Sequence, residues 1–152
     1  MRRLLLTIAL GTALASSALA QTAATPDLSG IWKLNFAKSK VSKKNKVRSD
    51  TITITTSGDT IQFHYSADPK DRLYTYIVDG KERPIGIWVE NDDFIVVKAT
   101  WEKSVLVIEH IVRVPGQDPI HDIDRWSLLS DGQSLMLDPS SNGKLSYFYD
   151  KQ

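Results

Sequence analysis

Hydrophobic and polar residues alternate over much of this 152-residue chain, in short runs separated by turn signals. Within residues 30–36, Trp32, Leu34 and Phe36 share one face of the strand, and the polar residues Lys33 and Asn35 share the other. This period of two predicts a strand with one buried face. Gly30 supplies backbone freedom at the strand entrance, and the indole of Trp32 is expected to plug the closed end of a barrel.

Similar runs follow along the rest of the chain, and none of them has helical periodicity. Between them lie Ser-Gly-Asp, Asp-Gly and Asn-Gly sequences, which favour tight turns between strands. Asp79-Gly80 in particular predicts a hairpin that joins the runs 72–78 and 85–90. The other runs expected to form strands are 50–56, 60–66, 94–101, 104–114, 120–130, 135–137 and 144–149.

These runs predict an all-β fold, an antiparallel meander closed into a small lipocalin- or avidin-like β-barrel of about 8–10 strands. A meander of this length avoids exposed strand edges best when it closes on itself. A sandwich of two sheets is the alternative that fits the same strand spacing.

The first 20 residues have the pattern of a secretion signal. Arg2 and Arg3 form a positive start, an apolar run extends from Leu4 to Ala15, and Ala18-Leu19-Ala20 is a small-x-small cleavage site. The sequence therefore predicts a signal peptide over 1–20, a single domain over 21–152, and a periplasmic or secreted bacterial protein. A retained membrane anchor is the alternative, although the run is short and diluted by glycine, threonine and serine.

The composition of the chain gives no reason to expect a nucleic-acid partner or a transmembrane segment, but it does not identify a partner. The chain has no cysteine, so its stability must come from the hydrophobic core. Without Arg2 and Arg3, the 19 basic residues fall to 17 against 18 acidic residues, which gives no reason to expect a nucleic-acid partner. No later apolar run is long enough to span a bilayer as a helix, so no transmembrane segment is expected after cleavage.

Residues 37–49 are strongly basic, with little apolar content and no acidic residue. They are expected to form a long solvated loop after the first strand. Either the lysines of this exposed loop keep the protein soluble, or the loop forms a cationic rim that attracts an anionic molecule to the barrel mouth. Its basic residues are Lys38, Lys40, Lys43, Lys44, Lys46 and Arg48.

The stretch 27–35, Asp-Leu-Ser-Gly-Ile-Trp-Lys-Leu-Asn, followed by Ala37-Lys38-Ser39, resembles the opening of a family of small exported bacterial proteins described as lipocalin-like or uncharacterised. Residues 57–61, 79–82 and 126–132 resemble later stretches of the same family. The resemblance covers most of the mature chain. It implies a lipocalin-like barrel, brings no set of catalytic residues, and makes Arg125 or Lys144 the candidate cation that packs on the first-strand tryptophan.

His110 is the polar residue that best fits a binding site. It shares a predicted strand face with Leu106, Ile108 and Val112, so it is either a hydrogen-bonded core residue, a polar anchor inside a cavity, or a haem ligand. Aromatic residues on other predicted inner faces are the natural walls of an apolar pocket. The residues expected to contact a ligand are Phe63, Tyr65, Tyr74, His110 and Trp126.

Catalytic and metal chemistry find little support. His121 points away from Asp122 and Asp124 on an extended strand, so the three residues do not form a metal site, and no metal or other cofactor is expected. There is neither a nucleophile elbow nor a glycine-rich phosphate loop.

The sequence predicts a non-enzymatic exported barrel that binds a small apolar or amphiphilic molecule in the periplasm or outside the cell. Two other classes stay open. One is an envelope interaction protein or periplasmic inhibitor that acts through barrel loops, and the other is an enzyme with an interior site around His110.

Overall fold

The computed structural model describes residues 25–41, 50–66, 71–88, 94–139 and 145–152. The predicted signal peptide, 1–20, lies outside these residues, as do Lys43, Lys44, Lys46, Arg48 and Lys144. In the described part of the chain, no helix has the length and apolar character needed to cross a membrane.

Ten strands make up the described structure, and it contains no helix. Burial alternates along β2 and β3 as the sequence predicts, and Gly58 and Gly132 have positive φ in the turns that follow β2 and β8. The strands are β1 (Gly30–Leu34), β2 (Thr51–Ser57), β3 (Thr60–Ser66), β4 (Arg72–Ile77), β5 (Arg83–Trp88), β6 (Phe94–Glu102), β7 (Val105–Arg113), β8 (Ile120–Leu128), β9 (Ser134–Pro139) and β10 (Tyr147–Lys151).

All ten strands belong to one antiparallel sheet, in the order β4-β3-β2-β1-β10-β9-β8-β7-β6-β5. Strands that follow one another in the chain are neighbours, except β4 and β5 at the two ends of the order, and β1 and β10 are joined by the pairs Trp32↔Lys151 and Leu34↔Tyr149. The predicted all-β antiparallel meander is therefore confirmed. The sandwich alternative is wrong, because the ten strands form a single sheet.

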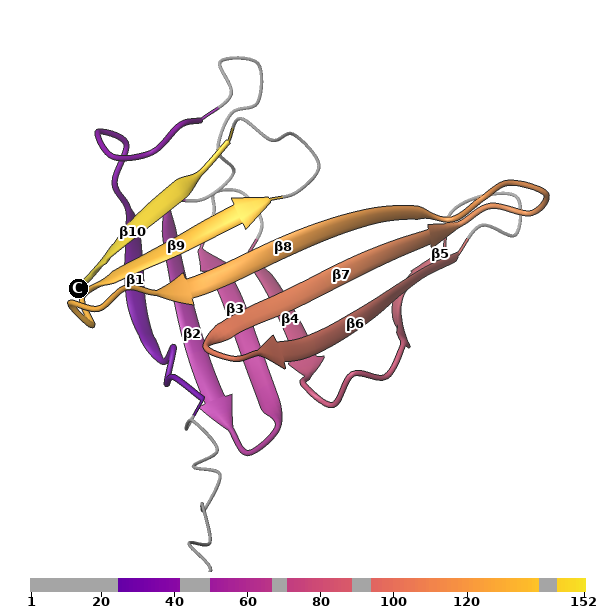
Figure 1. Cartoon of the computed structure of the whole chain (residues 1–152), viewed down its shortest axis with the longest axis horizontal. Helices are drawn as coiled ribbons and strands as arrows, with labels where there is room; N and C mark the ends of the chain where they lie inside the picture. Colours follow the sequence, from indigo (N-terminus) through magenta and orange to yellow (C-terminus); the bar gives the residue numbers. More distant parts are fainter. Residues whose placement is uncertain (1–24, 42–49, 67–70, 89–93, 140–144) are drawn as a thin grey trace, which may run out of the picture.

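The sheet curls until its two ends approach each other (Figure 1). β4 and β5 occupy the ends of the strand order, and β4 lies in contact with β6. The hairpin predicted at Asp79-Gly80 does not form, because β4 and β5 are not paired with each other. Instead, Asp79 accepts two hydrogen bonds from the guanidinium of Arg83, at 2.6 and 2.7 Å, and the Gly80 N–H donates to the Ala99 carbonyl of β6 at 2.9 Å. These bonds dock the connection on β6.

Trp32 lies on β1 and belongs to the hydrophobic core. Its side chain is fully buried, and the indole Nε1–H donates a hydrogen bond to the Leu28 carbonyl at 2.9 Å. The ammonium of Lys151 lies 5.3 Å from the centroid of the indole ring, in cation–π contact. The cation that packs on Trp32 is therefore Lys151, and the expectation that it is Arg125 is wrong. Arg125 points to the opposite sheet face from its neighbour Trp126, which lies in the core.

Leu34 is buried beside Trp32, but the expectation that Phe36 also points inward is wrong, because its side chain is 57% exposed. The strand ends at Leu34, and Asn35 then starts a turn. The Asn35 amide donates to Asp150 at 2.6 Å, and its side-chain oxygen accepts from the Lys38 N–H at 3.0 Å. This turn ends the alternation one residue before Phe36.

Candidate functional site

An aromatic cluster covers much of the inner face of the sheet, which is the face that carries the core. Alternation on β3 turns Phe63 and Tyr65 inward, and the register of β4 places Tyr74 opposite Phe63. The ring centroids of Phe63 and Trp126 are 5.0 Å apart, and those of Tyr65 and Tyr74 are 5.8 Å apart. We define the aromatic cluster as Phe63, Tyr65, Tyr74, Tyr76, Trp126 and Tyr149.

The structure brings the five residues predicted to contact a ligand together on this face. Four of them are members of the aromatic cluster. The fifth, His110, lies on β7 with its ring edge-on to Tyr76, at a centroid distance of 6.3 Å. Sequence reasoning missed Tyr76, Tyr149 and Asp124. The same alternation could have found two of them, because Tyr76 lies two residues after Tyr74 and Asp124 two residues before Trp126.

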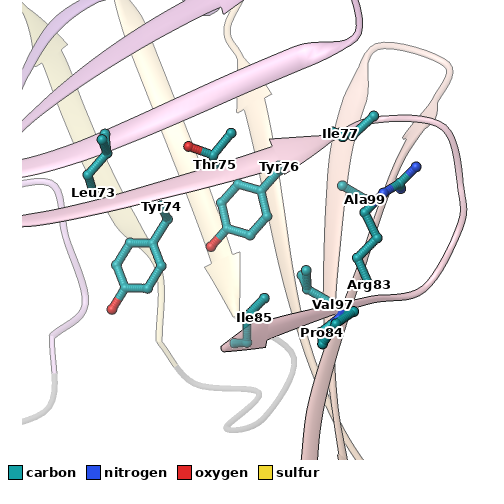
Figure 2. A pocket seen from close by; sticks show the side chains of 10 residues that line it. All are labelled: Leu73, Tyr74, Thr75, Tyr76, Ile77, Arg83, Pro84, Ile85, Val97 and Ala99. Atoms are coloured by element: carbon teal, nitrogen blue, oxygen red, sulfur yellow. The ribbon is translucent and has the colours of Figure 1, made fainter. Parts of the chain in front are cut away.

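A pocket of about 310 Å³ lies where the two ends of the sheet approach each other. Figure 2 shows the rings of Tyr74 and Tyr76 side by side, with Ile85 of β5 across from their hydroxyl ends. Tyr76 therefore belongs both to the aromatic cluster and to the pocket wall. The residues that line the pocket are Leu73, Tyr74, Thr75, Tyr76, Ile77, Arg83, Pro84, Ile85, Val97 and Ala99.

His110 faces the interior without a strong acid partner. Burial lowers its pKa, and the charge of Asp122, its cross-strand neighbour on β8, partly opposes this effect. Among the described residues, no carboxylate forms an ion pair with His110. The close histidine–carboxylate contact of this region, His121 Nδ1 to Glu109 Oε1 at 2.7 Å, lies on the other face of the sheet. The activated histidine that an interior enzyme site would need is therefore not formed by the described residues.

Asp124 places a carboxyl group on the inner face, opposite Ile108. Burial raises the pKa of this half-buried carboxyl to about 6, with a further contribution from the charge of Asp122. Burial also raises the pKa of Tyr65, Tyr76 and Tyr149, and the negative charge of Asp124 contributes in all three cases. Asp124 thus acts electrostatically on three hydroxyl groups of the aromatic cluster.

The predicted cationic rim is described only at its beginning. The Lys38 ammonium lies 3.0 Å from Asp150 Oδ1 in an exposed ion pair, and the backbone of Lys40 exchanges two hydrogen bonds with that of Ser146. The first of these basic residues is therefore neutralised by a partner on β10.

No metal site is formed within the described ranges, where no three histidine or acidic side chains are grouped so that they could hold an ion. Asp122 and Asp124 share the inner face, and His121 takes the opposite one, as the alternation predicts.

No family model matches this chain, and no curated protein matches it. Solved structures do match. The apo form of lipid binding protein 8 of Caenorhabditis elegans is similar with a TM-score of 0.60 and 15% identity, over 82% of this chain and 94% of that one. A protein described as the REP1-NXSQ fatty acid transporter is similar with a TM-score of 0.59 and 14% identity, over 82% of this chain and 96% of that one. These likenesses establish the fold, a curled β-sheet similar to that of lipid-binding barrel proteins.

Proposed function

We propose that this protein binds a small apolar or amphiphilic molecule on the inner face of its curled sheet. The observation that carries the proposal is the pocket of about 310 Å³, whose walls are mainly apolar and aromatic side chains, with Thr75, Arg83 and the hydroxyl groups of Tyr74 and Tyr76 as polar groups. Ligand sites are typically concave, mostly apolar and supplied with a few polar groups, with volumes of about 300–1,000 Å³. The pocket fits that description.

The fold supports the same proposal. The two similar solved structures carry titles that name lipid binding and fatty-acid transport. Fold alone does not determine function, so the weight rests on the inner face itself. There, Tyr74 and Tyr76 line the pocket, and the other aromatic side chains of the cluster pack behind them in the hydrophobic core.

We further propose that the protein acts in the periplasm or outside the cell, on the basis of the signal-like residues 1–20. Intact-mass measurement of the protein from an expressing bacterium is expected to give a chain that starts at Gln21. A mature chain that keeps residues 1–20 would instead support the membrane-anchor alternative.

Binding can be tested with the neutral fluorescent probe N-phenyl-1-naphthylamine, whose emission rises in apolar surroundings. We expect saturable binding to the wild-type protein. Ala99→Phe places a ring in the pocket and should remove most of the binding, whereas Thr100→Phe on the opposite sheet face should not. Circular dichroism and cooperative unfolding of both variants control for folding. Equal binding by wild type and Ala99→Phe, or no saturable binding at all, would contradict the proposal.

A further inference from the structure

One edge of β4 is open, because this strand ends the sheet and pairs only with β3. Just past its end, the Val78 N–H donates to the Asp59 carbonyl at 2.7 Å, which makes these two residues a hydrogen-bonded pair of the β3–β4 ladder. Such pairs alternate with pairs that are not bonded. Leu73, Thr75 and Ile77 therefore direct their backbone N–H and C=O groups away from β3. Among the described residues, none forms a hydrogen bond with these outward backbone groups.

The pocket runs along this open edge, since its wall includes every residue from Leu73 to Ile77. Tyr74 and Tyr76 place their side chains on the inner face, whereas those of Leu73, Thr75 and Ile77 point to the outer face (Figure 2). The pocket is therefore a slot between the edge of β4 and the strands across from it. The opposite wall comes from β5 and β6, namely Arg83, Pro84, Ile85, Val97 and Ala99.

A ligand in this slot covers backbone groups that need hydrogen-bond partners. Leu73 and Ile77 are 61% and 40% exposed, and Thr75 is exposed too, so water reaches the edge in the free protein. A ligand that displaces this water loses affinity unless it replaces the hydrogen bonds. A hydrocarbon chain has neither donor nor acceptor, whereas an extended peptide offers an N–H and a C=O at every second residue along each edge.

The walls of the slot suit an uncharged, apolar segment. Among the described residues that line it, the charged one, Arg83, is neutralised by Asp79, whose carboxylate oxygens lie 2.6 and 2.7 Å from the terminal guanidinium nitrogens. On the outer face, the exposed side chains next to the edge are those of Leu73 and Ile77. A strand added here would therefore have apolar cross-strand neighbours on both of its faces.

We propose that the pocket takes an extended, uncharged apolar segment of a partner polypeptide, which adds to the sheet as a strand alongside β4. This inference rests on the proposed function and names the class of its ligand. The backbone of the segment pairs with Leu73, Thr75 and Ile77. Its side chains alternate between the inner face, beside Tyr74 and Tyr76, and the outer face. The paired part is about five residues long, since the outward groups of β4 span that length.

The recessed position of the edge favours a single extended chain over a second copy of this protein. β4 lies in contact with β6, and the connection between β4 and β5 is held on β6 by the hydrogen bond from the Gly80 N–H to the Ala99 carbonyl. The strands across the slot thus stand in the way of another folded sheet. The strand at the other end of the sheet, β5, contains Pro84, which has no N–H to offer.

The experiment displaces N-phenyl-1-naphthylamine from the full protein with the peptide acetyl-Lys-Val-Thr-Val-Thr-Val-Lys-amide, whose end lysines keep it in solution. The matched control peptide carries N-methyl groups on the central valine and the threonine after it, so both edges of its strand lose a donor. We expect the control to bind at least about tenfold more weakly, because a β4 carbonyl is then covered without a donor.

Two further measurements locate the peptide on β4. Thr75→Pro removes a donor at a position that does not bond to β3, and it should weaken peptide binding by a similar factor. In amide hydrogen exchange, Thr75 of the free protein should exchange faster than Tyr74 and Tyr76, which bond to β3. The peptide should slow exchange at Thr75 more than the N-methylated control does.

Each other outcome is decisive. If the probe binds but the peptide does not displace it, if the two peptides bind equally, or if Thr75 is not slowed, the inference is overturned while the proposed function stands. Failure of the probe and of both peptides to bind rejects the proposed function itself. Slow exchange at Thr75 in the free protein, with a dimer mass in light scattering, would show that a second copy covers the edge and would also overturn the inference. If Thr75→Pro does not unfold cooperatively, the two peptides on the wild-type protein decide.

Discussion

Asp124→Asn should stabilise the ligand-free protein, because a carboxylate held among aromatic rings costs folding free energy. The rise of its pKa from 3.8 to about 6 corresponds to about 3 kcal/mol once the group is ionised in both states. The carboxyl is only half-buried, so solvent screens part of this cost, and we expect a gain of about 1–2 kcal/mol at about pH 7.5.

The sign of the pH effect follows from proton binding. Between pH 3.8 and about 6, the folded protein holds a proton on Asp124 that the unfolded chain has released. The destabilisation by Asp124 is therefore absent below that range, grows through it, and is complete above it. The advantage of Asp124→Asn over wild type should accordingly vanish toward about pH 3.5.

Urea unfolding of wild type, Asp124→Asn and the surface control Asp118→Asn, at matched pH values and without ligand, measures this difference. The comparison is made between variants at each pH because His110, whose pKa burial lowers, changes stability in the opposite direction. The reasoning is refuted if Asp124→Asn is less stable than wild type at about pH 7.5, or if its gain does not change with pH.

Two further substitutions test the packing of Trp32. Trp32→Ala should cost about 3–5 kcal/mol in urea unfolding, as expected for a fully buried aromatic residue; a loss below about 1 kcal/mol would reject its place in the core. Gly30→Ala should cost about 1–3 kcal/mol, because φ is +147° and the added Cβ would lie 2.9 Å from Cε of Lys151; unchanged stability would show that Lys151 can leave the indole freely.

The fold could be predicted because its signals are local. Period-two alternation and glycine-containing turns define antiparallel strands with an inner and an outer face, and the alternation places Trp32 on the inner face of the first strand. The prediction that Phe36 points inward is wrong because alternation alone does not show where a strand ends. The strand ends where Asn35 bonds to Asp150, which is far away in the chain, and to the Lys38 N–H within a turn. Neither bond can be read from the alternation.

The partners across the sheet could not be predicted in the same way. Lys151 reaches Trp32 only through the pairing of the first and last strands, which no local pattern reveals. The sequence Asp79-Gly80 is typical of a hairpin turn. In the structure, its bonds to Arg83 and Ala99 instead hold the connection between β4 and β5 against β6. Asp124 stands out in the sequence only for its closeness to His121 and Asp122, whereas the register of β7 and β8 places it on the inner face with Trp126.

The central claim is that the inner face of the sheet holds an apolar or amphiphilic molecule. An isotope-filtered nuclear Overhauser experiment tests it most directly, with ¹³C-labelled protein and an excess of unlabelled dodecylamine. We expect contacts from the ligand methylenes to the side chains of Tyr74, Tyr76 and Ile85, which line the pocket. Contacts confined to the exposed side chains of Ile31, Phe36 and Ile120, or none at saturation, would contradict the claim.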